Sequence, residues 1–160
     1  MISTLRQKYS SLYGKDVDQN QMDQRFISLV SDHKALFGKD NPMIFSAAGR
    51  TEIAGNHTDH NLGMVIGASI NIDTIAAVSK RDDMMVTFIS EGFPKCTIDL
   101  SNLEVREEEK NTTASLLRGI AKAFKDRGVE IGGWEANVTS KVLKGSGLSS
   151  SASVEVLMGE

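Results

Sequence analysis

The sequence predicts a mixed α+β domain, with a largely antiparallel sheet and helices packed against it. Its 160 residues are enough for one domain with a hydrophobic core, and 40% hydrophobic and 24% charged residues are ordinary for a globular protein. Segments with strand and helix patterns follow one another in the order β, β, β, β, α, β, α. That order favours a mixed architecture.

The first strong helical pattern lies in residues 22–37. Apolar side chains recur there at helical spacing, and Gly38 follows as a stop. We expect residues 1–42 to form an N-terminal helical extension and residues 43–160 to form the main domain.

Five extended segments are expected after this helix. They are rich in β-branched residues and bounded by charged or turn-forming residues, and they cover residues 43–47, 64–79, 84–90, 96–100 and 134–142. The second segment is either two strands or one long bent strand, and the fourth is expected to pair with the third. The charged turn at Lys80–Asp83 is typical of a hairpin loop.

Two further helices complete the pattern. The first carries an apolar face over residues 116–124 and ends near Arg127. Gly128 follows at the position after a helix end where the left-handed conformation is common. The last opens in a run of serines and reaches Glu160 without a cap, so we expect the chain to be part of a longer protein.

Charge and cysteine content narrow the class of protein. The net charge of −3 gives no general attraction to nucleic acid or to an anionic membrane. Cys96 is the only cysteine, which excludes an intramolecular disulfide and fits a reducing compartment, the cytoplasm. The N-terminus lacks the apolar core of a secretory signal, and no window is long and apolar enough for a membrane span.

The stretch KGSGLSSSAS, residues 144–153, lies between a predicted strand and a predicted helix. Glycines allow a ligand close to the main chain, and a helix N-terminus with its free N–H groups attracts an anion, for which phosphate is the natural candidate. The stretch lacks the Gly-Lys-Ser/Thr of a Walker A loop and the third glycine of a dinucleotide fingerprint. Capping turns of this composition are also common, and a serine nucleophile is disfavoured because no G-x-S-x-G is present.

The stretch GRTEIAGNHTDHN, residues 49–61, gathers polar side chains ahead of an apolar segment. A lone arginine such as Arg50 is usually structural, and His57, Asp59 and His60 could instead bind a metal. Support for a complete set of zinc ligands is weak, because the remaining histidine and the cysteine lie far from this stretch in the sequence. A hydrogen-bonding cluster for a polyhydroxylated ligand such as a sugar is the better interpretation. Together the two stretches suggest phosphoryl transfer from a nucleotide to a sugar.

The two stretches match a known family. GRTEIAGNHTDHNLG resembles the galactokinase signature, and GSGLSSSAS resembles the second motif of the GHMP kinases. The resemblance covers about residues 43–160 and implies the GHMP kinase N-terminal fold, which is ribosomal protein S5 domain 2-like. It also implies a sugar 1-kinase acting on galactose or a related sugar, with ATP and Mg²⁺ as cofactors.

The resemblance also implies roles for individual residues. Arg50 would be catalytic, stabilising the charge that develops during transfer, and Ser151 would hold Mg²⁺. The sugar would be bound by Arg50, Asn56, His57, Thr58 and Asp59. The nucleotide would be bound by Ser90, Gly145, Ser146, Gly147, Leu148, Ser149, Ser150 and Ser151.

Several positions depart from the family pattern. Asn56 replaces a glutamate and His60 a tyrosine, so the identity of the sugar stays open. The others are Ala48, Thr113 and Leu143, where the family has two prolines and a tryptophan. The catalytic aspartate, the acidic Mg²⁺ ligand and the third, Gly-rich motif are expected in a segment beyond this chain, so the chain alone should not turn over. The alternatives are a sensor that binds sugar and ATP without catalysis, and an interaction domain with neither activity.

Overall fold

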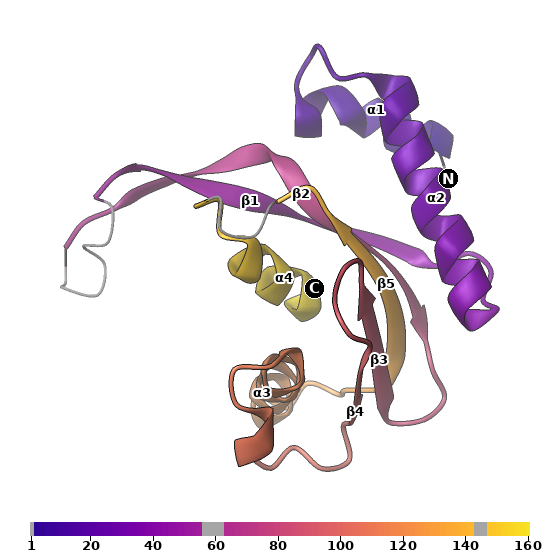
Figure 1. Cartoon of the computed structure of the whole chain (residues 1–160), viewed down its shortest axis with the longest axis vertical. Coiled ribbons are helices and arrows are strands. Elements are labelled where there is room, and N and C mark those ends of the chain that lie inside the picture. Colours follow the sequence, from indigo (N-terminus) through magenta and orange to yellow (C-terminus); the bar gives the residue numbers. More distant parts are fainter. Residues whose placement is uncertain (1, 56–62, 143–146) are drawn as a thin grey trace.

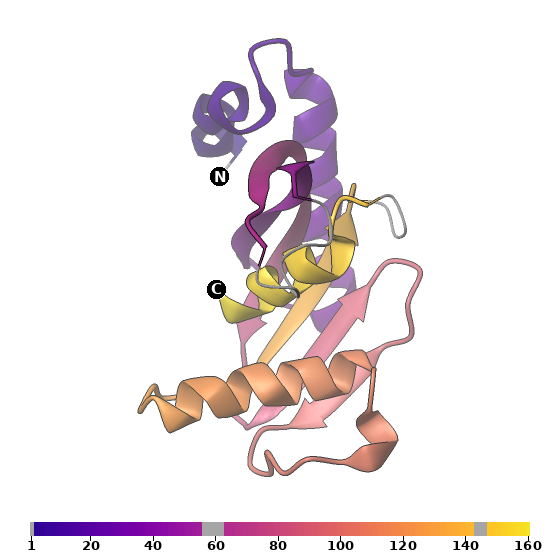
Figure 2. The same cartoon turned by 90° about the vertical axis from the view of Figure 1, so that its left-hand side faces the viewer.

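The structure, a computed structural model, describes residues 2–55, 63–142 and 147–160, and has three layers. Helices α1 and α2 cover one face of a five-stranded sheet, and α3 and α4 lie on the other (Figures 1 and 2). In chain order the elements are α1 (Ile2–Tyr13), α2 (Gln19–Phe37), β1 (Met43–Ala54), β2 (Ile66–Lys80), β3 (Met85–Ser90), β4 (Cys96–Asp99), the 3₁₀ helix η2 (Glu107–Glu109), α3 (Thr113–Asp126), β5 (Trp134–Ser140) and α4 (Ser150–Gly159). The mixed α+β class is confirmed.

The strands are ordered β1-β2-β5-β3-β4 across the sheet. Three of the four pairings are antiparallel, and β3 pairs with β5 in parallel. The predicted pairing of the third and fourth strands is therefore confirmed. The hairpin interpretation of the Lys80–Asp83 turn is wrong, because β5 inserts between the two strands that this turn connects. Long-range pairing of this kind leaves no mark in the local sequence.

The sheet is buried on both faces. On one side, α3 and α4 contribute Leu117 and Leu157 to a core with the strand residues Val86, Phe88, Ala136 and Val138. On the other, α1 and α2 pack against β2 through Tyr9, Met22, Phe26, Leu29, Ile75 and Ala77. Because β2 contributes to both cores, its alternating side chains hold the two helical layers to one strand.

The helix ends follow from local chemistry. The side chain of Asp18 accepts hydrogen bonds from the backbone N–H groups of Asn20 and Gln21, which caps α2. Gly38 ends the same helix in the left-handed region at φ 66°, as the sequence predicts. Gly128, at φ 77°, follows the end of α3 in the same way. No helix among the described residues is both long and apolar enough to cross a membrane.

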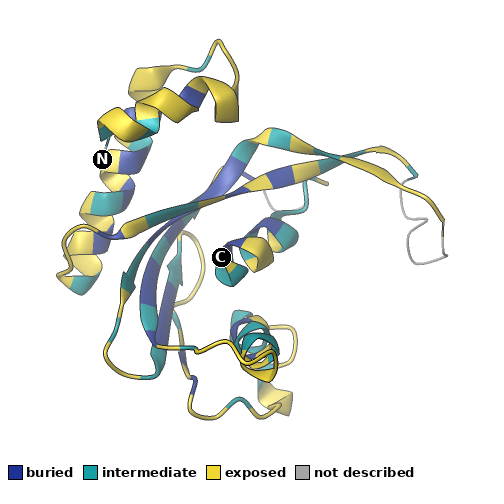
Figure 3. Cartoon of the chain, turned by 180° about the vertical axis from the view of Figure 1, so that it is seen from behind, coloured by how far each residue is buried: buried dark blue, intermediate teal, exposed yellow. Residues whose placement is uncertain are grey.

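The strands β1 and β2 extend beyond the rest of the sheet as a two-stranded arm, formed by residues 50–54 and 66–69 (Figures 1 and 3). The sequence predicts a loop from Gly49, but the structure continues β1 to Ala54. The second extended segment is one strand, and the register between the two strands shifts between Ala48 and Arg50. Ladder hydrogen bonds to β2 stabilise this polar stretch as a strand despite its composition.

Gly55 follows the end of β1 in the arm. A Cβ atom on Gly55, which has φ +83°, would lie 2.2 Å from the carbonyl oxygen of Met64. Gly92 has a similar φ of +79°, but a Cβ there would meet nothing within 4 Å. A substitution at Gly55 would therefore combine a backbone clash with left-handed strain, whereas one at Gly92 would cause the strain alone.

We expect Gly55→Ala to loosen the arm. Because the added methyl group collides with backbone, amide exchange over residues 50–54 should accelerate by roughly tenfold or more, as measured by hydrogen–deuterium exchange. The matched variant Gly92→Ala should cost only about 1 kcal/mol of left-handed strain and leave the arm unchanged. Equal exchange rates in the two variants would contradict the close approach at Gly55.

His33 provides a prediction about pH. His33 belongs to α2, its side chain is fully buried, and its Nε2 lies 2.7 Å from Ser79 Oγ on β2. Burial lowers the pKa of His33, although the nearby charge of Glu135 opposes the shift. The unfolded chain therefore binds the proton more readily, so this contribution to stability is complete above about pH 6.5 and is lost as the pH falls through the lowered value.

We expect His33→Gln to remove this dependence. The free energy of unfolding in urea should fall between pH 7.5 and pH 5 in the parent protein, and should fall less in the variant. Ser79→Ala, which keeps the histidine, should retain the steeper slope. Parallel pH profiles for the parent and His33→Gln would show that His33 does not titrate differently on unfolding.

Candidate functional site

The structure describes only part of the site that the sequence predicts. Six of the predicted residues lie outside the described residues: Asn56, His57, Thr58, Asp59, Gly145 and Ser146. The others are Arg50 on β1, Ser90 at the end of β3, and Gly147, Leu148, Ser149, Ser150 and Ser151 at the start of α4. Their positions can be compared directly.

A backbone hydrogen bond joins the two sequence motifs. The N–H of Arg50 donates to the carbonyl oxygen of Leu148 at 3.1 Å. Arg50 follows the break in register, and such irregularities redirect the backbone groups of a strand. A Cβ on Gly49, next to it, would lie 3.0 Å from Ile70 Cδ1 and 3.1 Å from Val142 Cγ2, so these two side chains would have to shift to admit it. The polar stretch and the Gly/Ser stretch, a hundred residues apart in sequence, are thus in contact.

Among the described residues, the side chain of Arg50 makes one long ion pair, with Glu52. It is 56% exposed, and its Nη2 atom lies 3.4 Å from Glu52 Oε1. Both residues lie on the same face of β1, two positions apart. An exposed pair at this distance contributes little to stability, so the guanidinium group can turn toward a ligand at small cost. Its fixed charge and five donors suit it to phosphate.

The start of α4 has the features of an anion site. Gly147 and Ser149 both adopt positive φ, 75° and 60°, and positive φ is uncommon for serine. Ser149 is the N-cap residue, but its side chain makes no capping hydrogen bond to the helix. The side chain of Ser149 therefore does not occupy the N–H groups of the first turn, which lie at the positive end of the helix dipole.

The serines of this helix start divide into two kinds. Ser151 is exposed, whereas Ser153 is buried and its Oγ lies 2.9 Å from Thr74 Oγ1. Backbone N–H groups and an exposed hydroxyl are donors and ligands that fit a phosphate group with a hard cation such as Mg²⁺. Glu155 is exposed on the same helix. No group of three or more histidine, cysteine or acidic residues suited to a metal ion occurs among the described residues.

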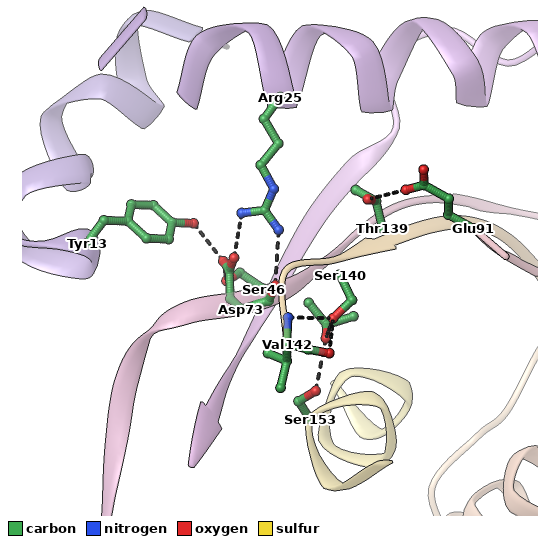
Figure 4. Close-up of polar contacts among 10 residues, drawn as sticks. Tyr13, Arg25, Ser46, Asp73, Glu91, Thr139, Ser140, Val142 and Ser153 are labelled. Carbon is green, nitrogen blue, oxygen red and sulfur yellow. Dashed lines mark hydrogen bonds and ion pairs between the residues drawn. The ribbon is translucent and has the colours of Figure 1, made fainter. Parts of the chain in front are cut away.

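Ser90 lies at the edge of the sheet from which the Gly/Ser stretch leaves. It pairs with Val138 across the parallel strands β3 and β5, and β5 ends two residues later at Ser140. Its neighbour Glu91 accepts a hydrogen bond from Thr139 Oγ1 at 2.9 Å (Figure 4). Ser90 therefore lies at the same end of the sheet as Ser140, after which the chain leads into the Gly/Ser stretch. No bond links Ser90 to Arg50 or to α4 among the described residues.

Sequence analysis missed a buried polar cluster beneath this site. The carboxylate of Asp73 accepts hydrogen bonds from Tyr13 Oη at 2.6 Å, Arg25 Nη1 at 2.5 Å and Ser46 Oγ at 2.5 Å (Figure 4). Burial, together with the bond to Asp73, raises the pKa of Tyr13, so its hydroxyl stays a donor at neutral pH. The signal available in the sequence was a lone aspartate inside a β-branched strand.

Comparisons with known proteins indicate one family. Residues 31–80 match the galactokinase galactose-binding signature. A galactokinase from Clostridium beijerinckii is 39% identical over 133 residues, covering 82% of this chain and 34% of that protein. A galactokinase from Streptococcus suis is 37% identical over 147 residues, covering 89% of this chain and 35% of that protein.

Solved structures show the same relationship. The crystal structure of Lactococcus lactis galactokinase complexed with galactose has a TM-score of 0.72 and 34% identity, covering 84% of this chain and 35% of that chain. The Methanococcus jannaschii mevalonate kinase, at 16% identity and a TM-score of 0.60, shares the fold. The chain spans about a third of the length of the curated relatives it matches. Its motifs, its fold and these relatives place the chain in the galactokinase family.

Proposed function

We propose that the protein carrying this chain transfers the γ-phosphoryl group of MgATP to the anomeric hydroxyl of galactose or a related sugar. The observation that supports the proposal is the hydrogen bond from Arg50 N to Leu148 O, because it joins the start of the polar stretch, residues 49–61, to the Gly/Ser stretch, residues 144–153. Phosphoryl transfer needs the two substrates positioned in line and the moving charge neutralised. A site built from both stretches would supply these two requirements.

On the sugar side, we assign binding to Asn56, His57, Thr58 and Asp59, which follow β1 directly in sequence. Carboxylate, imidazole and amide groups accept and donate the hydrogen bonds that sugar hydroxyls make. We assign Arg50 to the transition state. Its exposed guanidinium group, only weakly paired with Glu52, can bind the oxygen atoms that gain charge during transfer.

On the nucleotide side, we assign the phosphates to residues 145–151 and the adenine to the neighbourhood of Ser90. The backbone N–H groups at the start of α4 would donate to phosphate oxygens, and the exposed hydroxyl of Ser151 would be a Mg²⁺ ligand. Bound Mg²⁺ neutralises charge on the phosphates. We assign no general base within the 160 residues, and attribute that role to an aspartate in the part of the family's length that this chain does not span.

A substrate panel tests the proposal. The protein in its full reading frame is mixed with MgATP and each of a set of hexoses, ADP release is measured, and phosphorus NMR identifies the product. A sugar 1-phosphate formed from galactose or a close relative is the expected result. Tight sugar binding in calorimetry without product would instead indicate a sensor, and the absence of heat with MgATP would indicate neither function.

We expect Arg50→Ala to reduce turnover far more than sugar affinity. If the guanidinium group acts on charge that develops in the transition state, kcat should fall by roughly 10²- to 10³-fold while the KM for sugar changes little. Steady-state kinetics of the full-length protein provide the measurement. Arg106→Ala, an arginine beside η2, is the matched control and should keep both constants. A rise in KM without loss of kcat would make Arg50 a binding residue only.

A further inference from the structure

Two adjacent residues of β2 face opposite layers of the molecule. Asp73 is 3% exposed and Thr74 is fully buried. Because side chains alternate along a strand, Asp73 faces α1 and α2 while Thr74 faces α4. Neither residue belongs to the two motifs, and buried polar groups of this kind are kept where they make specific hydrogen bonds.

Thr74 bonds to the strand that precedes the Gly/Ser stretch and to the last residue of that stretch. Its Oγ1 lies 2.7 Å from Ser140 Oγ, at the end of β5, and 2.9 Å from Ser153 Oγ, in the first turns of α4. Ser140 Oγ in turn accepts from the N–H of Val142 at 3.1 Å, and Ser153 Oγ donates to the carbonyl oxygen of Ser150 at 2.9 Å. The hydroxyl of Thr74 thus links β5, the strand before the stretch, with α4, the helix at its end.

Asp73 holds the segment that follows β5, just before the Gly/Ser stretch. Its carbonyl oxygen accepts from the backbone N–H of Lys141 at 3.0 Å and from Arg25 Nη2 at 3.1 Å. Its carboxylate binds Arg25 Nη1, and both partner side chains are under 10% exposed. Charge-assisted bonds in such a buried setting hold their geometry well, so α2 keeps this point of β2 in place.

We propose that Thr74 is a positioning residue that clamps the two ends of the Gly/Ser stretch and thereby sets the affinity for MgATP. The inference rests on the proposed function for the identity of the ligand. Ordering backbone groups when a ligand binds costs free energy. Fixing both ends in advance lowers that cost, so the clamp should act on nucleotide affinity and leave sugar affinity alone.

Three variants of the full-length protein test the clamp. Thr74→Val keeps the branched shape and removes the hydroxyl, whereas Thr74→Ser keeps the hydroxyl. Thr87→Val is the matched control, because Thr87 is a buried threonine of the same sheet that pairs with Thr97 on β4, far from the stretch. Thermal unfolding of each variant first establishes that it folds.

The first measurement needs no substrate. Hydrogen–deuterium exchange over residues 147–153 should accelerate by roughly tenfold in Thr74→Val, the effect of losing about one hydrogen bond, and should stay near the parent rate in Thr74→Ser and Thr87→Val. Unchanged exchange in Thr74→Val, or equal acceleration in Thr87→Val, would overturn the clamp. This result stands whether or not the protein proves to be a kinase.

The second measurement is kinetic. In Thr74→Val the KM for MgATP should rise by roughly tenfold while the KM for sugar stays within about twofold, and Thr74→Ser should restore the parent value. A parallel rise in both KM values would overturn the assignment to nucleotide affinity. An inactive parent protein would overturn the proposed function instead, and the exchange experiment would still decide the clamp.

Discussion

The alternation of side chains along β2 is the constraint on which the rest of the structure depends. With a period of two, neighbouring residues must face opposite layers, and both layers of this sheet are covered by helices. Ile75 and Ala77 therefore pack against α1 and α2, while Ala76 belongs to the core under α3 and α4. A shift of one residue in register would exchange the two sets. It would also turn the carboxylate of Asp73 away from its partners Arg25 and Tyr13.

The candidate site lies where this strand and its neighbours leave the covered part of the sheet. There β1 changes register and becomes the exposed arm, and the amide of Arg50 reaches the carbonyl oxygen of Leu148. The site thus combines a rigid base, which is the buried sheet, with two stretches whose composition favours ligand contact over packing. Binding residues are commonly placed in this way, on connections held by a stable scaffold.

Strain and polarity are concentrated at the same place. Ser149 adopts positive φ at the start of α4, and nearby the hydroxyl of Thr74 bonds to the hydroxyls of Ser140 and Ser153. A left-handed serine persists only where its surroundings fix it, and a buried hydroxyl chain is one means of doing so. The N-terminal helices contribute through Arg25, so they share in the same scaffold. The division of the chain at residue 42 stays a prediction.

The sequence by itself determined the class of fold, most of the elements and the two motifs. Helix α2 with its stop at Gly38, α3 with Gly128 and the strand β3 all follow from periodicity and from local backbone preferences, which act within a few residues. The motifs could be recognised because their residue types are unusual in so short a span.

Only the tertiary structure decided how these pieces meet. The insertion of β5 between β2 and β3, the extension of β1 through a polar stretch, and the partners of Asp73 and Thr74 depend on contacts between residues about 12 to 80 positions apart. Such contacts are set by burial and by hydrogen bonds that form only when the layers pack, and a local pattern carries no record of them.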